Sequence, residues 1–143
     1  MHILLILLQA NMEIKIDTKE KFTVVTPILP KLTAIIAAEI EAICSLQLQK
    51  EVKNMILNLT NVELVEELAA EAIMDLQQRF YENSASFVIC CIQSSVENSF
   101  EKLEIIELLN ITPTETEAWD IVQMEEIERE LLDSDDVIFE SKN

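Results

Sequence analysis

The sequence predicts a single α/β domain that ends in an acidic helix, and three observations lead to this fold class. The chain has 143 residues, which is enough for one domain of ordinary size and too few for two. Hydrophobic residues make up 50% of it, so it can bury a real core. Apolar runs of strand length alternate along the chain with segments whose apolar residues recur at helical spacing.

Strands are predicted where short apolar runs lie between polar or turn-forming residues. Residues 12–17 and 22–26 are expected to pair across a lysine-rich turn, and two prolines then close that region. Residues 55–59 form a compact apolar run of strand length. Residues 87–92 are nearly all apolar, which is typical of a central strand covered on both faces.

Helices are predicted from apolar stripes that follow the helical period. These stripes are Leu32, Ile35, Ile36, Ile40 and Ile43; Leu68, Ala72, Ile73, Leu76 and Phe80; Val96, Phe100 and Leu103; and Ala118, Trp119, Ile121, Val122, Met124, Ile127 and Leu131.

Two helix starts carry capping signals. Ser94 and Glu97 form an S-x-x-E capping box before the third helix. Thr112 followed by Pro113 and Glu115 predicts that the last helix begins with proline at its first position.

The two ends of the chain are predicted to lie outside the domain, which would span residues 12–132. The six apolar residues at 3–8 are too few to cross a bilayer and lack the basic flank of a secretory signal. Residues 1–11 are therefore interpreted as a doubtful extension, with translation beginning at Met12. Residues 133–143 lose the helical period and are predicted to be a disordered acidic tail.

Composition excludes several classes of function. Glycine is absent, so the glycine-rich phosphate loops and the nucleophile elbow cannot occur in standard form. The net charge of -17 argues against binding to nucleic acid or to an anionic membrane surface. Residues 115–143 alone hold 11 carboxylates against two basic residues, a net charge of -9. They are interpreted either as a distinct acidic module or, equally well, as a face that only keeps the protein soluble.

The cysteine and histidine content points to a cytoplasmic protein without catalysis. Cys44, Cys90 and Cys91 are an odd set, and neighbours in a strand point to opposite faces, so we expect buried, reduced thiols. The only histidine is His2, which leaves histidine catalysis and the usual zinc sites without ligands. We expect no enzyme activity, no cofactor and no metal.

From about Glu13 to Leu132 the chain resembles the STAS domain, the fold of bacterial anti-sigma factor antagonists and of the cytoplasmic tails of sulfate transporters. The resemblance rests on the strand NMILNLTNVELV, the helix EELAAEAIMDLQQRF, the strand SFVICCI and the helix SSVENSFEKLEIIELLNI, and the closing PTETEAWDIVQMEEIERELL is similar to the end of small bacterial members. It implies a mixed central sheet of about four to five strands packed by helices.

The motif that is most specific to that family departs from its usual form here. The family carries an aspartate, two serines or threonines and a glycine between a strand and a helix, and a partner anti-sigma kinase phosphorylates one of the hydroxyls, which switches binding off. The matching positions are Glu66, Glu67, Leu68 and Ala69. The acid is kept at Glu66, the acceptor hydroxyl is replaced by Glu67, and the glycine is replaced by Ala69.

Two interpretations of this degenerate site stay open. A helix N-terminus favours an anion by about 0.3 to 1 kcal/mol, so Glu67 could imitate a phosphoserine that never reverts. Alternatively, Glu66 and Glu67 are simply favourable residues in the first turn of a helix. A relocated acceptor at Thr60, Ser94 or Ser95 is a further alternative.

The terminal helix offers a second candidate surface, for which Trp119, Val122 and Glu126 are the residues singled out. Its clustered acids Glu125, Glu126, Glu128 and Glu130 lack the loop spacing and glycine turn of a calcium site, so a solvated face is the better explanation.

The resemblance implies a non-enzymatic regulatory module in signalling and transcription control. Such a module would bind an anti-sigma factor, a kinase-like regulator or a paralogue without the usual phosphorylation. The alternative is a structural or assembly protein that uses its acidic amphipathic helix. Formation of a homodimer stays open.

Overall fold

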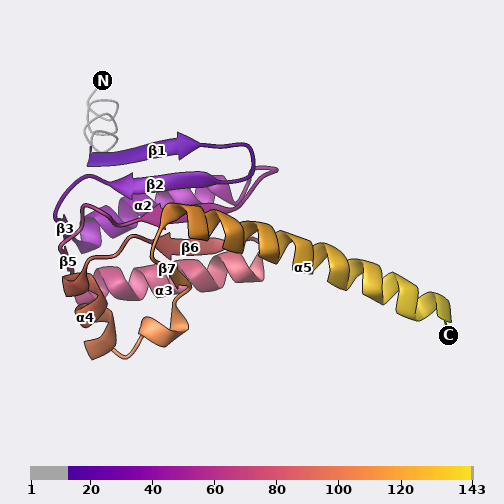
Figure 1. Cartoon of the computed structure of the whole chain (residues 1–143). Helices are drawn as coiled ribbons and strands as arrows, with labels where there is room; N and C mark the ends of the chain where they lie inside the picture. Colours follow the sequence, from indigo (N-terminus) through magenta and orange to yellow (C-terminus); the bar gives the residue numbers. More distant parts are fainter. Residues whose placement is uncertain (1–12, 143) are drawn as a thin grey trace, which may run out of the picture.

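The computed structural model describes the backbone of residues 13–142 and the side chains of residues 13–133. The predicted extension 1–11, the start at Met12 and His2 lie outside the described residues. A five-stranded sheet forms the centre, with strand order β1-β2-β4-β6-β7. Helices α2, α3 and α4 share one core cluster with this sheet, whereas α5 packs against the opposite face (Figure 1).

The sheet is mixed, as predicted. β1 (Ile14–Thr18) pairs antiparallel with β2 (Thr23–Pro27), and Lys19 N–H closes the hairpin on the Phe22 carbonyl at 2.8 Å. β2 then pairs in parallel with β4 (Met55–Asn58), β4 with β6 (Phe87–Cys90), and β6 with the short β7 (Ile111–Thr112).

The central strands are buried on both faces. In β4, Met55 and Leu57 join the core beneath α2 and α3, while Ile56 between them faces α5. All four residues of β6 are buried. The nearly continuous apolar composition of β6 is therefore explained by helices on both sides of the sheet.

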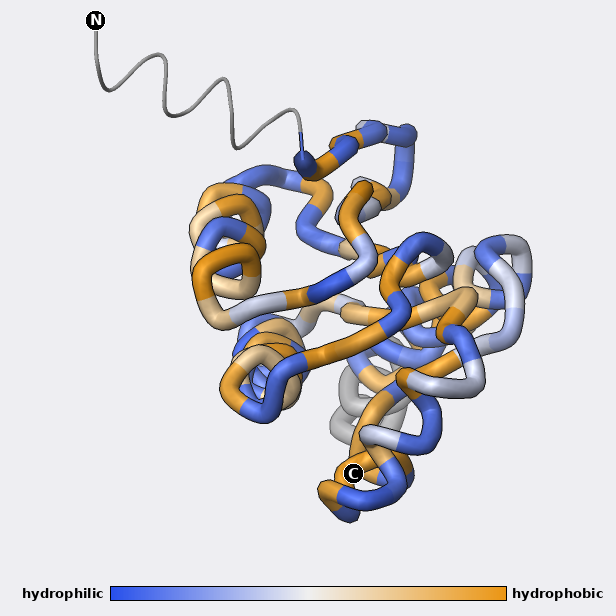
Figure 2. The backbone as a smooth tube through the Cα atoms, turned by 90° about the vertical axis from the view of Figure 1, so that its left-hand side faces the viewer, coloured by the Kyte–Doolittle hydropathy of each residue, from blue (hydrophilic) through white to orange (hydrophobic). Residues whose placement is uncertain are grey.

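The helices occupy the predicted segments, with shifted starts. They are α2 (Ala34–Gln47), α3 (Glu67–Glu82), α4 (Ser94–Lys102) and α5 (Glu115–Lys142). Hydrophobic and hydrophilic colours alternate along each of them in Figure 2, as expected of amphipathic helices.

Both predicted capping signals are wrong in detail. Ser94 is already helical, Gln93 occupies the N-cap of α4, and no side chain caps that end. Thr112 belongs to β7, and Pro113 precedes the true cap, which is Thr114: its hydroxyl accepts the Glu117 N–H at 3.1 Å. The β7 pairing holds Thr112 in the sheet, so the helix begins two residues later than the motif suggested.

Two residues of the stripes predicted for α2 and α3 do not face the core. Ile35 is 74% exposed and Leu68 is 66% exposed. Each follows the helical period only loosely, because it lies about 100° round the helix from its buried neighbour, Ile36 or Ala69.

Several short elements were not predicted. β3 (Lys31–Leu32) and β5 (Leu64–Val65) form a separate two-stranded parallel pair, and a 3-10 turn, η1 (Ile106–Leu108), precedes β7. The backbone of α5 also continues past Leu132 to Lys142, where a disordered tail was predicted. Figure 1 shows this last part running away from the body of the domain.

Candidate functional site at the start of α3

The candidate site lies where the small β3–β5 pair brings the N-termini of α2 and α3 together. Leu32 pairs with Val65, and the Glu66 N–H donates to the Leu32 carbonyl at 3.0 Å. The N–H groups of Glu63 and Leu64 both donate to the Pro30 carbonyl. Two helix N-termini, each with first-turn amides that have no partner within their own helix and with a partial positive charge, therefore lie side by side.

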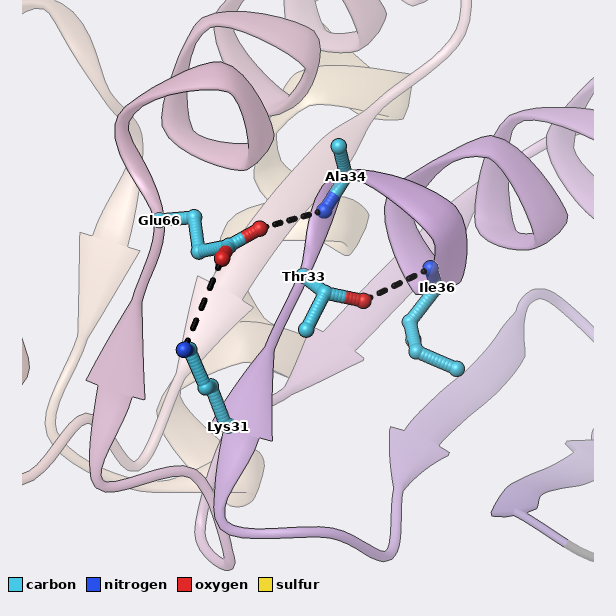
Figure 3. Close-up of polar contacts among 5 residues, drawn as sticks. All are labelled: Lys31, Thr33, Ala34, Ile36 and Glu66. Carbon is cyan, nitrogen blue, oxygen red and sulfur yellow. Dashed lines mark hydrogen bonds and ion pairs between the residues drawn. The ribbon is translucent and has the colours of Figure 1, made fainter.

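Glu66 fills the space between these two termini. It is the N-cap residue of α3, but its side chain makes no capping bond to its own helix. Instead, Oε1 accepts the Ala34 N–H at the first residue of α2 at 3.0 Å, and Oε2 lies 3.6 Å from Nζ of Lys31. Figure 3 shows the carboxylate between these two partners.

The N-terminus of α2 is thus capped twice. Thr33 Oγ1 accepts the Ile36 N–H at 3.3 Å, and the carboxylate of Glu66 accepts the Ala34 N–H (Figure 3). The ion pair with Lys31 is half-exposed and contributes little by itself. Glu66 therefore has an internal role in this chain, joining α2 to α3.

Glu67 is placed quite differently. It is the first residue of α3 and is exposed to solvent. Among the described residues, no side-chain hydrogen bond or ion pair involves its carboxylate. The helix N-terminus beneath it favours a negative charge, and that charge is presented outward.

Leu68 and Ala69 are the other two of the four predicted residues, and one is exposed whereas the other is buried. Leu68 is 66% exposed and Leu64, four residues before it, is 48% exposed. Ala69 is fully buried in the core beneath α3 and has no positive φ, so its position needs no glycine. The exposed side chains of the junction therefore include Glu67 and, near it in the chain, Leu64 and Leu68.

The residues singled out on the terminal helix lie elsewhere, on the far face of the sheet. Val122 is fully buried there, and Glu126 accepts a hydrogen bond from the side-chain amide of Asn54. Trp119 packs against Phe22, with ring centroids 5.2 Å apart, and keeps 38% of its surface exposed. These three residues hold α5 to the sheet, which leaves Val122 no surface to offer a partner.

The cysteines and clustered acids make no reactive centre among the side chains of residues 13–133. Cys44, Cys90 and Cys91 are free, and no group of three or more potential metal ligands is found in that part of the chain. Burial raises the pKa of Cys44 from 9.0 to about 12. Burial, together with a side-chain hydrogen bond to the neighbouring Cys91, also raises the pKa of Cys90. Both thiols are therefore protonated and inert near neutral pH.

The sequence could not indicate the partners of Glu66. Lys31 and the Ala34 amide reach it only because two-residue strands pair over a separation of 33 positions along the chain. The one available signal was the threonine before the helix, which is a common N-cap residue.

These features define a class of protein: a small α/β domain with a mixed sheet whose distinctive surface is the N-terminus of a helix that follows a two-residue strand. The sequence profile of the STAS domain matches residues 13–118, so the chain belongs to the STAS domain family. A comparison with curated protein sequences gives no match.

Solved structures agree with this fold. The chain is similar to a protein from Thermotoga maritima that is classed as an anti-sigma factor antagonist. The TM-score is 0.69 at 16% identity, and the match covers 80% of this chain and 98% of that one. An anti-sigma factor antagonist from Mycobacterium paratuberculosis gives a TM-score of 0.66 at 11% identity, covering 77% and 92%.

The fold also occurs within a transporter. Murine Solute Carrier 26 family member A9, an anion transporter, gives a TM-score of 0.63 at 13% identity, covering 86% of this chain but only 24% of that one. In the present protein, none of the described helices is long and apolar enough to span a bilayer.

Proposed function

We propose that this protein is a non-enzymatic regulatory module that binds a protein partner through the start of α3, in the manner of an anti-sigma factor antagonist, and that its binding is not switched by phosphorylation there. The observation that carries the proposal is the placement of Glu67. It is an exposed, unpaired carboxylate, among the described residues, at the position where the family carries its phosphorylated hydroxyl.

The geometry supports a permanent charge rather than a switch. A phosphoserine brings a charge of about -2 at neutral pH, whereas Glu67 brings one fixed negative charge on a longer side chain. Because the Glu66 carboxylate already contacts Ala34 and Lys31, Glu67 is the acid of the motif whose charge has no partner among the described residues. Leu68 next to it has no hydroxyl, so the motif offers no acceptor.

Apolar side chains at the same place suit a protein partner. Leu64 and Leu68 expose about half or more of their surfaces, at 48% and 66%. Exposed leucines beside a charged residue are favourable contacts for another protein and unfavourable in water.

The other hydroxyls near the junction are placed less suitably. Ser95 already donates its hydroxyl hydrogen to the Glu63 carbonyl at 2.6 Å, so phosphorylation would break that bond. Thr60 is exposed in the turn after β4, and its carbonyl accepts from Gln93. Mass spectrometry after incubation with kinase and ATP would detect modification at either residue.

The test uses serine-kinase anti-sigma factors encoded in the same genome as this protein. Affinity is measured by titration calorimetry for the wild type, Glu67→Gln and Glu67→Ser, with Glu71→Gln as the matched control, because Glu71 is exposed on the next turn of α3. If the Glu67 carboxylate imitates the phosphorylated state, removing its charge should strengthen binding by about tenfold, or about 1.4 kcal/mol.

The remaining outcomes separate the interpretations. Glu67→Ser should also become a substrate of the kinase, whereas Glu71→Gln should keep the wild-type affinity. Equal affinities for the wild type, Glu67→Gln and Glu67→Ser would overturn the hypothesis that Glu67 imitates a phosphoserine. Glu67 would then be only a favourable residue at the start of the helix.

A further inference from the structure

The inner face of α5 crosses the whole sheet, from the ends of the parallel strands to their beginnings. Near its start, Glu115 accepts from Asn58, the last residue of β4, at 3.1 Å. Four turns later, Arg129 donates to the hydroxyl of Ser86 at 3.2 Å, just before β6. Ala118 and Val122 between these anchors are fully buried. This side of α5 is therefore packed against the sheet and is not available to a partner.

The outer face of the same helix carries a second apolar stripe that nothing in the described chain covers. Met124, Ile127 and Leu131 are spaced three and four residues apart, and they are 54%, 54% and 55% exposed. At about 100° per residue, they lie roughly half a turn round the helix from Ala118, Val122 and Arg129. The stripe thus faces directly away from the sheet.

The charges beside this stripe all have one sign. Glu117, Glu128 and Glu130 are exposed along its sides, and Asp120 is exposed at its N-terminal end. The only basic side chain between residues 115 and 133 is Arg129, and it is turned toward Ser86 and Asn54 on the sheet. The outer face is therefore apolar along its centre and acidic along its margins.

We propose that the outer face of α5, defined by Met124, Ile127 and Leu131, is a docking surface for a basic amphipathic helix of a partner protein. Apolar anchors at spacings of three and four residues match the way one helix packs along another. Acidic margins attract lysine and arginine on the partner and give it its orientation. A second copy of α5 fits this surface poorly, because its margins would place carboxylates opposite carboxylates.

This docking surface is independent of the start of α3, since α3 and α5 pack against opposite faces of the sheet. The proposal does not rest on the function proposed for Glu67. A protein with both surfaces can hold two partners at once, one at each face.

The probe for the test is a fluorescein-labelled synthetic helix of about five turns, with leucines at helical spacing and lysines at its other positions. Its affinity is measured by fluorescence anisotropy at two salt concentrations. The apolar contact is tested with Ile127→Gln combined with Leu131→Gln. The matched control is Ile35→Gln combined with Leu46→Gln on α2, where the two residues are 74% and 63% exposed.

The margins are tested separately with Asp120→Asn combined with Glu128→Gln, and their matched control is Glu101→Gln combined with Glu104→Gln near α4, where both carboxylates are exposed. These charge variants keep the proposal testable if the apolar variants fail to fold. Circular dichroism and the emission of Trp119 check that α5 remains docked on the sheet.

We expect the α5 apolar variant to bind the probe at least about tenfold more weakly and its control to bind within about twofold of the wild type. The α5 charge variant should weaken binding and reduce its salt dependence more than the Glu101 and Glu104 control does. Equal losses in variants and controls would overturn the proposal, because they would indicate unspecific attraction to an acidic protein. Sedimentation showing a dimer that Ile127→Gln and Leu131→Gln dissociate would overturn the choice of occupant in favour of a second copy.

Discussion

The carboxylate of Glu66 accepts the backbone N–H of Ala34 at 3.0 Å, so the first residue of α2 is capped by a side chain from 32 positions further along the chain. The same carboxylate lies 3.6 Å from Nζ of Lys31. Glu66 therefore ties together the two helices whose N-termini form the candidate site. Its neighbour Glu67 has no such internal partner among the described residues, and its carboxylate is exposed to solvent.

Glu66→Ala should destabilise the fold. Loss of a capping acceptor costs about 0.5 to 2 kcal/mol, because the amide of Ala34 then loses its side-chain partner. Glu66→Gln keeps an oxygen that can accept this bond and should cost less. Glu67→Ala serves as the control and should change the free energy of unfolding by no more than about 0.5 kcal/mol. Urea denaturation measures all three, and equal losses at both positions would contradict the division of roles.

Val122 and Ile127 belong to the same apolar set in the sequence but face opposite ways in the fold. Val122 is fully buried against the sheet, whereas Ile127 is 54% exposed. Val122→Ala should therefore cost about 1 to 3 kcal/mol of unfolding free energy, since it removes buried methyl groups and leaves a cavity. Ile127→Ala should be nearly neutral. If thermal or urea denaturation gave the reverse order, α5 would not be docked as described.

Asn54 is the polar anchor beneath the middle of α5. Its buried side chain donates to the Lys21 carbonyl and to Glu126, and its Oδ1 accepts the Ser86 N–H at 2.9 Å. Asn54→Ala should cost about 1 to 3 kcal/mol, because the Ser86 amide is left buried without a partner. Trp119 emission should also shift as α5 loosens. The exposed Asn61→Ala is the control, and an unchanged unfolding midpoint for Asn54→Ala would contradict this assignment.

The stability of the protein should fall as the pH rises from 8 to 10. Burial raises the pKa of Cys44 from 9.0 to about 12, so the folded thiol stays protonated while the unfolded thiol ionises above pH 9. The unfolded state then binds fewer protons, and between pH 8 and pH 10 the free energy of unfolding decreases by about 1.4 kcal/mol in total for this group.

The matched comparison for that prediction is Cys44→Ala, measured by urea denaturation at both pH values. The substitution removes the titrating group, so the difference in stability between pH 8 and pH 10 should become smaller. An identical pH dependence in the two proteins would show that Cys44 is not responsible.

Much of the fold could be predicted from the sequence because its core elements carry strong periodic signals. The apolar run that became β6 and the stripe through Ile73, Leu76 and Phe80 were placed correctly, since burial on a sheet demands continuous or periodic apolar residues. The two-residue strands β3 and β5 carry no such signal. Their pairing is set by the tertiary fold, and it is this pairing that brings Glu66 to α2.

The candidate site was located by its resemblance to a family motif, but the roles within it needed the structure. Glu66 and Glu67 are adjacent and chemically identical, so no pattern distinguishes the one that caps α2 from the one that faces solvent. The same holds for α5, where an apolar set covering most of the helix circumference hides which residues face the sheet. Backbone geometry decides this, because each step of one residue turns the side chain by about 100°.

The most direct test of the central claim is to map the binding surface by NMR, titrating isotope-labelled protein with a serine-kinase anti-sigma factor from the same genome. Our account predicts that the backbone amide signals of Leu64, Glu67 and Leu68 change most. It also predicts that Glu67→Gln binds more tightly and that the same amide signals change. Binding that leaves the start of α3 unchanged would contradict the account.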